Sequence, residues 1–100
     1  MAKKESLFKH DLYKKIRARF PGSDVLPNDA GYAQGIPDAT VYLPNGRFLM
    51  LESKRHSKAS HRPNQDYYVS ESPLSANAMF AFPENEEEVF SELERRYNLK

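Results

Sequence analysis

Residues 48–54 read Phe48-Leu49-Met50-Leu51-Glu52-Ser53-Lys54, an apolar run that ends in two opposite charges one residue apart. A short apolar run bounded by turn residues predicts a buried β-strand. Side chains alternate between the two faces of a strand, so Glu52 and Lys54 should project from the same face. Burying a carboxylate and an ammonium group without partners is unfavourable, which makes this strand end a candidate functional site.

A second carboxylate, Asp38, opens the preceding predicted strand, which covers residues 38–43 and alternates in polarity. Pro44-Asn45-Gly46 predicts a hairpin turn between the two strands. Antiparallel pairing about this turn places Asp38 near residue 53 or 54. Two carboxylates and a lysine that meet at one sheet edge suit a divalent cation beside a phosphodiester. The same residues also fit a turn-capping aspartate and an exposed ion pair.

The other elements follow from apolar periodicity and from the positions of proline and glycine. The expected elements are a helix over 5–20, a strand at 25–26, a loop over 29–35, strands over 38–43 and 48–54, a polar mobile loop over 55–62, a helix over 63–72, a strand over 78–82 and a helix over 84–97. The order α-β-β-β-α-β-α predicts an α/β fold, with a mixed sheet and helices packed on it.

Composition limits the class of protein. The chain has 100 residues, 39% hydrophobic and 29% charged, so we expect one globular domain over residues 1–100. It has no cysteine, which excludes disulfides, zinc–thiolate sites and cysteine nucleophiles and is compatible with a reducing cytoplasm. No apolar run approaches the roughly 20 residues that span a bilayer, and the first residues lack a hydrophobic signal region. We therefore expect no membrane partner.

Charge is distributed unevenly along a chain whose net charge is +1. Residues 1–20, which include Lys3 and Lys4, carry a net charge of +5, and residues 53–64 carry +4. Residues 84–96 carry −4. This pattern indicates a basic surface for a polyanion and an acidic surface away from it. Two solvated helix faces of opposite sign would give the same pattern.

These motifs resemble the PD-(D/E)xK nuclease superfamily, with Pro37-Asp38 followed by Glu52-Ser53-Lys54. Within that superfamily the chain is similar to small phage and prophage nucleases related to VRR-NUC domains and archaeal Holliday junction resolvases. Three flanking segments extend the resemblance: the loop at 28–35, the basic stretch that leads to Pro63-Asn64-Gln65, and the acidic helix start at 83–88. The resemblance covers residues 5–97 and implies a restriction-endonuclease-like α/β core.

The motif residues have distinct expected roles. Asp38 and Glu52 would coordinate Mg²⁺ or Mn²⁺, and Lys54 would position the attacking water or balance the charge at phosphorus. The resemblance implies that the backbone carbonyl of Ser53 adds a metal ligand and that Gln65 lies near the active site. It also implies a metal-linked acid on the first helix, where Glu5 lies on the apolar face. Glu5 fits equally well as a helix-N-terminal glutamate, and Gln65 as a solvated helix residue.

Polar and basic residues around these motifs are candidates for DNA contacts. The loop after the lysine of the motif would grip the phosphate backbone without reading sequence, although plain solvation fits the same loop. The candidate DNA-binding residues are Gln34, Arg55, His56, Lys58, His61 and Arg62. Tyr67 and Tyr68 are expected in the core or in a dimer interface rather than as platforms for base stacking.

The sequence therefore predicts a metal-dependent DNA endonuclease in the cytoplasm, or in the host cytoplasm if a phage encodes it. Its expected cofactor is Mg²⁺ or Mn²⁺, and its expected substrate is DNA, which the resemblance to resolvases extends to branched or flapped forms. A homodimer is expected because a chain of this size offers little surface. Two other functions remain open: a non-catalytic DNA-binding module that keeps the fold, and a phage structural or interaction protein.

Overall fold

The computed structural model describes residues 5–99. Lys3 and Lys4, which belong to the basic N-terminal segment, lie outside the described residues. The elements are α1 (Glu5–Arg19), β1 (Asp24–Pro27), β2 (Ala39–Tyr42), β3 (Phe48–Ser53), α2 (Pro63–Ser70), η1 (Ser75–Asn77), β4 (Ala78–Ala81), η2 (Pro83–Asn85) and α3 (Glu86–Tyr97), where η denotes a 3₁₀-helix.

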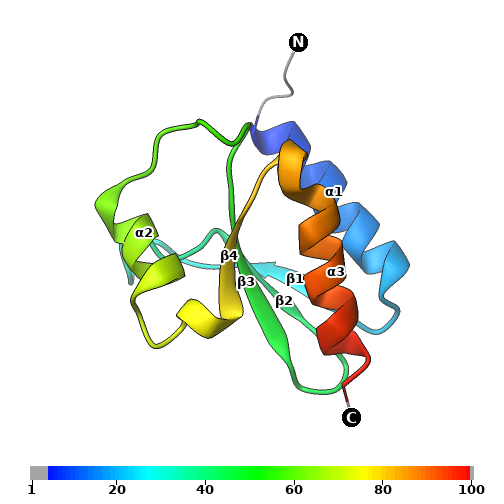
Figure 1. Cartoon of the computed structure of the whole chain (residues 1–100). Helices are drawn as coiled ribbons and strands as arrows, with labels where there is room; N and C mark the ends of the chain where they lie inside the picture. The colour runs from blue at the N-terminus through cyan, green and yellow to red at the C-terminus, as the bar shows by residue number, and fades with distance from the viewer. Residues whose placement is uncertain (1–4, 100) are drawn as a thin grey trace.

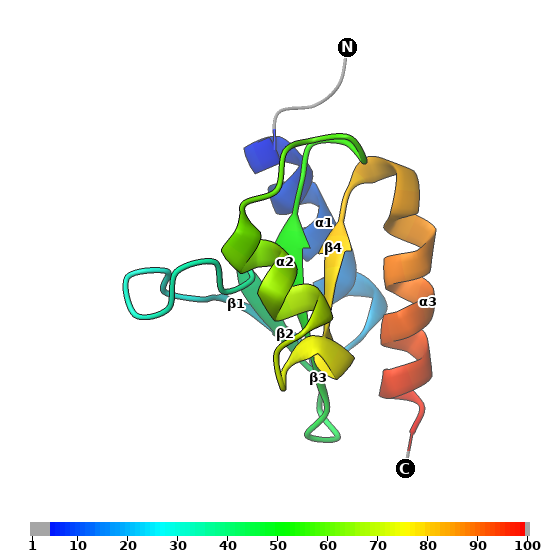
Figure 2. The ribbon, with the colours of Figure 1, turned by 60° about the vertical axis from the view of Figure 1, so that its left-hand side comes forward.

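The four strands form one mixed sheet in the order β1-β2-β3-β4. β2 pairs antiparallel with both β1 and β3, and β3 pairs parallel with β4. Helices α1 and α3 cover one face of the sheet, and α2 lies on the other face (Figures 1 and 2). The predicted α/β class and the predicted order α-β-β-β-α-β-α are confirmed. Among residues 5–99, no helix has the length and apolar character needed to cross a bilayer.

The hydrophobic core lies between the sheet and the helices α1 and α3. Apolar residues along one side of α1 are buried, as the apolar periodicity predicts. Helix α3 presents a second row of apolar residues to the same core. The core residues from these helices are Phe8, Leu12, Ile16, Val89, Phe90 and Leu93, and the facing strand residues are Val25, Ala39, Val41, Leu49 and Leu51. The alternate residues of β2 and β3 face the side of α2, which places Glu52 there.

A hairpin joins β2 and β3, as Pro44-Asn45-Gly46 predicts. Its three-residue loop is closed by Leu43, whose backbone N–H donates to the Arg47 carbonyl at 2.9 Å. Gly46 in this loop has φ +85°, the left-handed conformation that a three-residue hairpin loop uses. Because Ala39 pairs with Leu51, the register continues to Asp38 opposite Glu52, and the Asp38 carboxylate contacts the Ser53 amide, so its predicted position near residue 53 is confirmed.

Several element ends also differ from the sequence prediction. Helix α2 ends at Ser70 instead of residue 72, because the amides of Glu71 and Ser72 both donate to the Tyr67 carbonyl at 2.8 Å. The predicted helix over 84–97 begins as the separate 3₁₀ turn η2, and η1 was not predicted. Tyr67 is 46% exposed and so does not lie in the core; its alternative place in a dimer interface stays a prediction.

At Gly35 the loop at 28–36 approaches the start of α2 closely. The φ of Gly35 is +82°, and an added Cβ would lie 2.2 Å from Asn64 Cβ and 2.6 Å from the Asn64 backbone carbon. A contact below 3.0 Å cannot be accommodated without a shift of the backbone. The glycine is therefore required both for its left-handed backbone and for the close approach of the loop to α2.

Gly35 and Gly46, two of the three left-handed glycines among residues 5–99, provide a matched pair for testing this contact. Gly46→Ala should lower the free energy of unfolding by about 1–2 kcal/mol, the strain of a left-handed alanine, because an added Cβ meets nothing within 4 Å there. Gly35→Ala should lower it by clearly more, since the clash with Asn64 adds to the same strain. Urea denaturation of both variants measures the difference, and equal losses would show that the loop does not pack against α2.

Candidate active site

The predicted site residues meet where β2 begins and β3 ends. Asp38 directly precedes β2, and its Oδ2 accepts a hydrogen bond from the backbone N–H of Ser53 at 2.9 Å. Lys54 follows β3, and its own backbone N–H donates to the Ala81 carbonyl of β4 at 2.8 Å. The Asp38 carboxylate at the start of β2 is thereby held against the end of β3, as the predicted hairpin requires.

Gln65 links the two charged side chains of β3. Its Nε2 donates to Glu52 Oε2 at 3.1 Å, and its Oε1 accepts from Lys54 Nζ at 2.8 Å. The Lys54 ammonium lies 3.9 Å from Glu52 Oε2. Both charged side chains contact one residue of α2, which confirms that they project from the same face of the strand. Both are also buried, so this amide supplies hydrogen bonds that they could otherwise obtain only from water.

The first turn of α2 determines where Gln65 lies. Pro63 occupies the first helical position, which favours helix initiation there. The Gln65 side chain at the third position accepts a hydrogen bond from the Arg62 backbone N–H at 3.0 Å. The same amide oxygen thus serves the helix cap and Lys54. Gln65 accordingly contacts the charged cluster and is not simply a solvated helix residue.

The groups around the buried Glu52 carboxylate do not fully stabilise its negative charge. Glu52 is 3% exposed, and burial raises its pKa from 4.5 to about 7, with the charge of Asp38 adding to the rise. Lys54 and Lys9 oppose the rise, and Glu5 adds to it. Two carboxylates that share a site repel each other unless a cation or a proton intervenes. Without a cation, the raised pKa leaves Glu52 partly protonated near neutral pH.

Lys9 on α1 belongs to this cluster although the sequence did not single it out. Its Nζ lies 3.5 Å from Asp38 Oδ2 and 3.8 Å from Glu5 Oε2. Glu5 is therefore connected to Asp38 through Lys9, and its side chain is 43% exposed. The spacing of four residues between Glu5 and Lys9, on a helix already predicted to face the sheet, is a signal that could have identified this pair.

Tyr13, one further turn along α1, places a buried hydroxyl beside the cluster. Burial is the main cause that raises the pKa of Tyr13 to about 12, and the charges of Asp38 and Glu52 add to it. The Ser53 hydroxyl lies close enough to oppose part of this rise. The two hydroxyls do not meet the geometry of a hydrogen bond, and neither has another protein partner. They are therefore two buried polar groups directly behind the strand end.

The carboxylate oxygens of this cluster suit a divalent cation that takes only a few ligands from the protein. Asp38 and Glu52 supply hard carboxylate oxygens, and burial, followed by the charge of Asp38, raises the pKa of Glu52, so a cation bound there would favour its ionised form. Among residues 5–99, no group of three His, Asp or Glu side chains converges closely enough to hold a metal ion by itself. Mg²⁺ commonly uses one or two protein carboxylates, with waters and substrate phosphate completing its shell. The residues present match that type of site, and not a closed three-ligand cage.

The predicted DNA-binding residues divide into two groups. Arg55, Lys58 and Arg62 are exposed and free to reach a phosphate backbone. His61 makes internal contacts, since its ring stacks on Phe80 with 4.1 Å between centroids and its Nδ1 lies 2.9 Å from Asp66 Oδ1. The Nδ1 of His56 accepts from the Lys58 backbone N–H at 3.2 Å. Both histidine contacts favour a structural role for these two rings.

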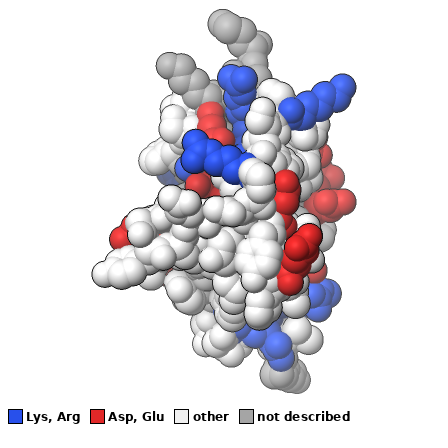
Figure 3. Space-filling model, turned by 90° about the vertical axis from the view of Figure 1, so that its left-hand side faces the viewer, with Lys and Arg blue, Asp and Glu red and all other residues white. Residues whose placement is uncertain are grey.

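The loop at 55–62 is tied to the body of the molecule. Ser57 donates to Glu84 Oε2 from its backbone N–H at 3.1 Å and from its hydroxyl at 2.9 Å. These bonds hold the predicted mobile loop against η2. Figure 3 shows the side of the molecule on which α2 lies. Lys and Arg atoms lie next to Asp and Glu atoms in the upper part of that side, above an area with few charged side chains.

Two hollows flank the loop at 28–36. Gln34 and Arg62, both predicted to contact DNA, line a hollow of about 570 Å³ together with Gly35 and Asn64. A second hollow of about 470 Å³ contains Asp38 of the site together with Lys9 and Arg17 of α1. Ala30 lines both hollows, so the loop forms a wall that they share.

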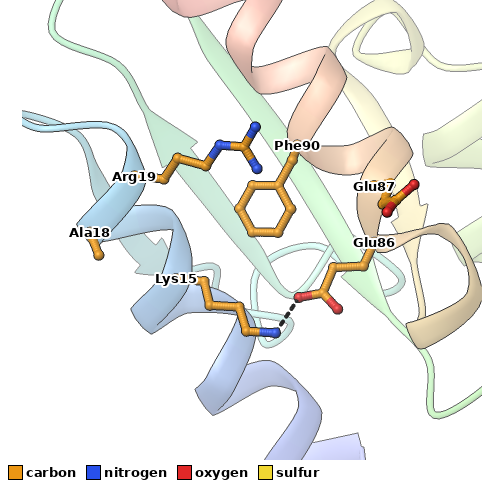
Figure 4. A pocket seen from close by; sticks show the side chains of 6 residues that line it. All are labelled: Lys15, Ala18, Arg19, Glu86, Glu87 and Phe90. Carbon is orange, nitrogen blue, oxygen red and sulfur yellow. Dashed lines mark hydrogen bonds and ion pairs between the residues drawn. The ribbon is translucent and has the colours of Figure 1, made fainter.

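A further hollow of about 510 Å³ lies between α1 and α3, away from the cluster. It is lined by Lys15, Ala18, Arg19, Glu86, Glu87 and Phe90 (Figure 4). Lys15 Nζ forms an ion pair with Glu86 at 2.8 Å, and the Arg19 guanidinium lies 5.0 Å from the centre of the Phe90 ring. Lys15 and Arg19 thus contact other residues that line this hollow. None of the predicted site residues lines it.

Comparison with known proteins adds no relative: no family model, no curated protein and no solved structure matches the chain.

The raised pKa of Glu52 predicts a specific pH dependence of stability in metal-free buffer. Between about pH 4.5 and about pH 7 the folded protein retains a proton on Glu52 that the unfolded chain releases, so the free energy of unfolding should fall as pH rises through this range. Glu52→Gln cannot ionise and should flatten this fall, which makes it more stable than the wild type above about pH 7.

Urea denaturation at a series of pH values in EDTA measures the effect. Glu88→Gln on the exposed side of α3 is the matched control and should keep the wild-type slope. Parallel pH profiles for the wild type and Glu52→Gln would contradict the raised pKa.

Proposed function

We propose that this protein is a metal-dependent DNA endonuclease of the PD-(D/E)xK type. The observation that carries the proposal is the convergence of Asp38, Glu52 and Lys54 at adjoining strand ends, with Gln65 bonded to the last two. These groups are separated along the chain and meet at one end of β2 and β3, where Glu52 and Lys54 are buried and Asp38 is half-buried. A carboxylate pair with a lysine held beside it is the arrangement that hydrolysis of a phosphodiester uses.

The chain's own groups have complementary tasks in such a hydrolysis. A water oxygen attacks phosphorus, the bond from phosphorus to the 3′-oxygen of the sugar breaks, and that oxygen leaves with a proton. Lys54, positioned by its 2.8 Å bond to Gln65, orients the attacking water or balances the negative charge that develops on the phosphate. Asp38 and Glu52 would hold the cation, and the hydrogen bond from the Ser53 amide orients the Asp38 carboxylate. The bound Mg²⁺ or Mn²⁺ supplies Lewis-acid stabilisation and a more acidic water.

The substrate proposed is DNA recognised through its phosphate backbone. The exposed side chains of Arg55, Lys58 and Arg62 follow the motif lysine and suit contacts that are independent of sequence. Because the described residues form one such catalytic cluster, cutting both strands of a duplex needs two copies of the chain, and a homodimer is therefore part of the proposal.

A DNA-binding module without catalysis is the second candidate, and the carboxylates argue against it. A surface that only grips phosphates gains nothing from Glu52, whose buried negative charge is already unfavourable and would repel a phosphate. A cation bound between the carboxylates and the phosphate would stabilise the buried charge of Glu52 and would also remove its repulsion of the phosphate. The uncompensated charge thus supports the metal-dependent enzyme over the passive binder.

Nicking of supercoiled plasmid tests the proposal. The wild type should convert plasmid to the open-circular form with Mn²⁺ or Mg²⁺ and not with EDTA. Asp38→Asn and Lys54→Met should each reduce the rate about 100-fold or more, a typical loss when one electrostatic contact to a developing charge is removed.

Glu88→Gln and Lys14→Met, both exposed, are controls of the same charge change and should cleave like the wild type. Circular dichroism melting confirms that each variant is folded. Cleavage that persists in folded Asp38→Asn and Lys54→Met would reject this assignment of the site. If the wild type cleaves with neither Mg²⁺ nor Mn²⁺, the proposal that the protein is a nuclease is rejected.

A further inference from the structure

Lys9 is a cation of the charged cluster to which the proposed hydrolysis gives no task. It extends from α1, and its Nζ lies 3.5 Å from Asp38 Oδ2 and 3.8 Å from Glu5 Oε2. The same Asp38 oxygen accepts a hydrogen bond from the Ser53 amide at 2.9 Å. The carboxylate oxygen that is held against the end of β3 is therefore also the one that faces the Lys9 ammonium group.

Lys9 offsets part of the negative charge of both carboxylates proposed to hold a cation. Its side chain is 28% exposed, and Glu5, one turn earlier on the same helix, is its second anionic partner. Burial and the charge of Asp38 raise the pKa of Glu52, and the charge of Lys9 opposes this rise. The Lys9 ammonium group thus provides positive charge at the place where a metal ion would provide it.

A divalent cation on Asp38 and the Lys9 ammonium group repel each other. Mg²⁺ binds carboxylate oxygens at about 2.1 Å, so a cation on Asp38 would lie within the ~8 Å over which physiological salt screens charges. Repulsion between a divalent and a monovalent charge at such a separation lowers affinity about tenfold. Lys9 therefore competes with a metal ion for this carboxylate.

The hollow beside the cluster gives the Lys9 ammonium group another anion to bind when DNA is present. Lys9 and Asp38 both line this hollow of about 470 Å³, and Arg17 is a second cation in its lining. A phosphate group in the hollow would attract both cations. Lys9 would then turn from Asp38 to the phosphate, and the carboxylate would become free for a metal ion.

We propose that Lys9 competes with the metal ion for Asp38 until a DNA phosphate draws the Lys9 ammonium group away, so that metal and DNA promote each other's binding. Lys9 is then a positioning residue that weakens the hold of the site on its cation until the substrate arrives. This inference rests on the proposed function and adds a regulation of its metal site. The coupling is reciprocal, so it can be measured on either ligand.

Binding of Mn²⁺, followed by electron paramagnetic resonance without DNA, tests the competition independently of cleavage. A titration at pH 8, above the pKa of about 7 of Glu52, keeps that carboxyl largely ionised. Lys9→Met should bind Mn²⁺ about tenfold more tightly than the wild type, because the repulsion is lost. Lys9→Arg keeps the charge and should bind like the wild type. Lys14→Met, an exposed position of α1 with the same charge change, is the matched control and should also bind like the wild type.

Fluorescence anisotropy of a labelled DNA duplex, with and without Mn²⁺, tests the coupling. All proteins carry Lys54→Met, which limits cleavage during the titration. Mn²⁺ should strengthen DNA binding about tenfold more when Lys9 is present than in Lys9→Met, because only Lys9 has to leave Asp38 before the metal binds. Lys14→Met should keep the full gain from Mn²⁺.

Several results would overturn the inference in variants that circular dichroism shows to be folded. Mn²⁺ affinity in Lys9→Met that equals or falls below that of the wild type would show that Lys9 does not compete with the metal. Tighter Mn²⁺ binding by Lys14→Met would show a general effect of net charge. An equal gain in DNA binding from Mn²⁺ with and without Lys9 would remove the coupling.

Failure of this inference and failure of the proposed function give different results. If Lys9→Met binds Mn²⁺ like the wild type while plasmid nicking depends on Asp38, the competition fails and the nuclease stands. If Lys9→Met binds Mn²⁺ more tightly while no metal supports cleavage, the nuclease fails and the competition stands. If no variant binds Mn²⁺ and no plasmid is nicked, both fail.

Discussion

Gln65 donates to Glu52 and accepts from Lys54, and these two bonds hold opposite charges together in a buried position. The rest of the site depends on this bridge. It requires α2 to begin at Pro63, and the close approach of Gly35 to Asn64 then fixes the loop at 28–36 against the same helix start. One helix terminus thus positions both the charged cluster and the loop that projects beside it.

The charged side chains Asp38, Glu52 and Lys54 all have hydrogen-bond partners, but their charges are not balanced. Lys54 and Lys9 contact the carboxylates, yet burial and the charge of Asp38 still raise the pKa of Glu52 to about 7. A site built for stability alone would bury apolar side chains here, because a buried ion pair is seldom more favourable than apolar packing. The imbalance is understandable if a further cation enters during function, and this reasoning links the energetics of the fold to the proposed hydrolysis.

Local patterns predicted the framework of the site, and long-range packing determined the remainder. Alternation along residues 48–54 places Glu52 and Lys54 on one face, and the hairpin brings Asp38 to them; the structure confirms both. The three-residue loop closed by Leu43 and Arg47 makes Glu52 the strand partner of Asp38 and leaves the Asp38 carboxylate on the Ser53 amide, as predicted. Lys9 was missed because its contact with Asp38 depends on how α1 crosses the sheet, which no local pattern specifies. The two hollows beside the loop arise from the same packing.

A crystal grown with Mn²⁺ and measured at the manganese absorption edge tests the central claim most directly. The account predicts an anomalous difference peak in contact with carboxylate oxygens of Asp38 and Glu52, with the Lys54 ammonium group beside it. A fully occupied manganese peak elsewhere on the molecule, or none at these two carboxylates at a saturating concentration, would contradict it.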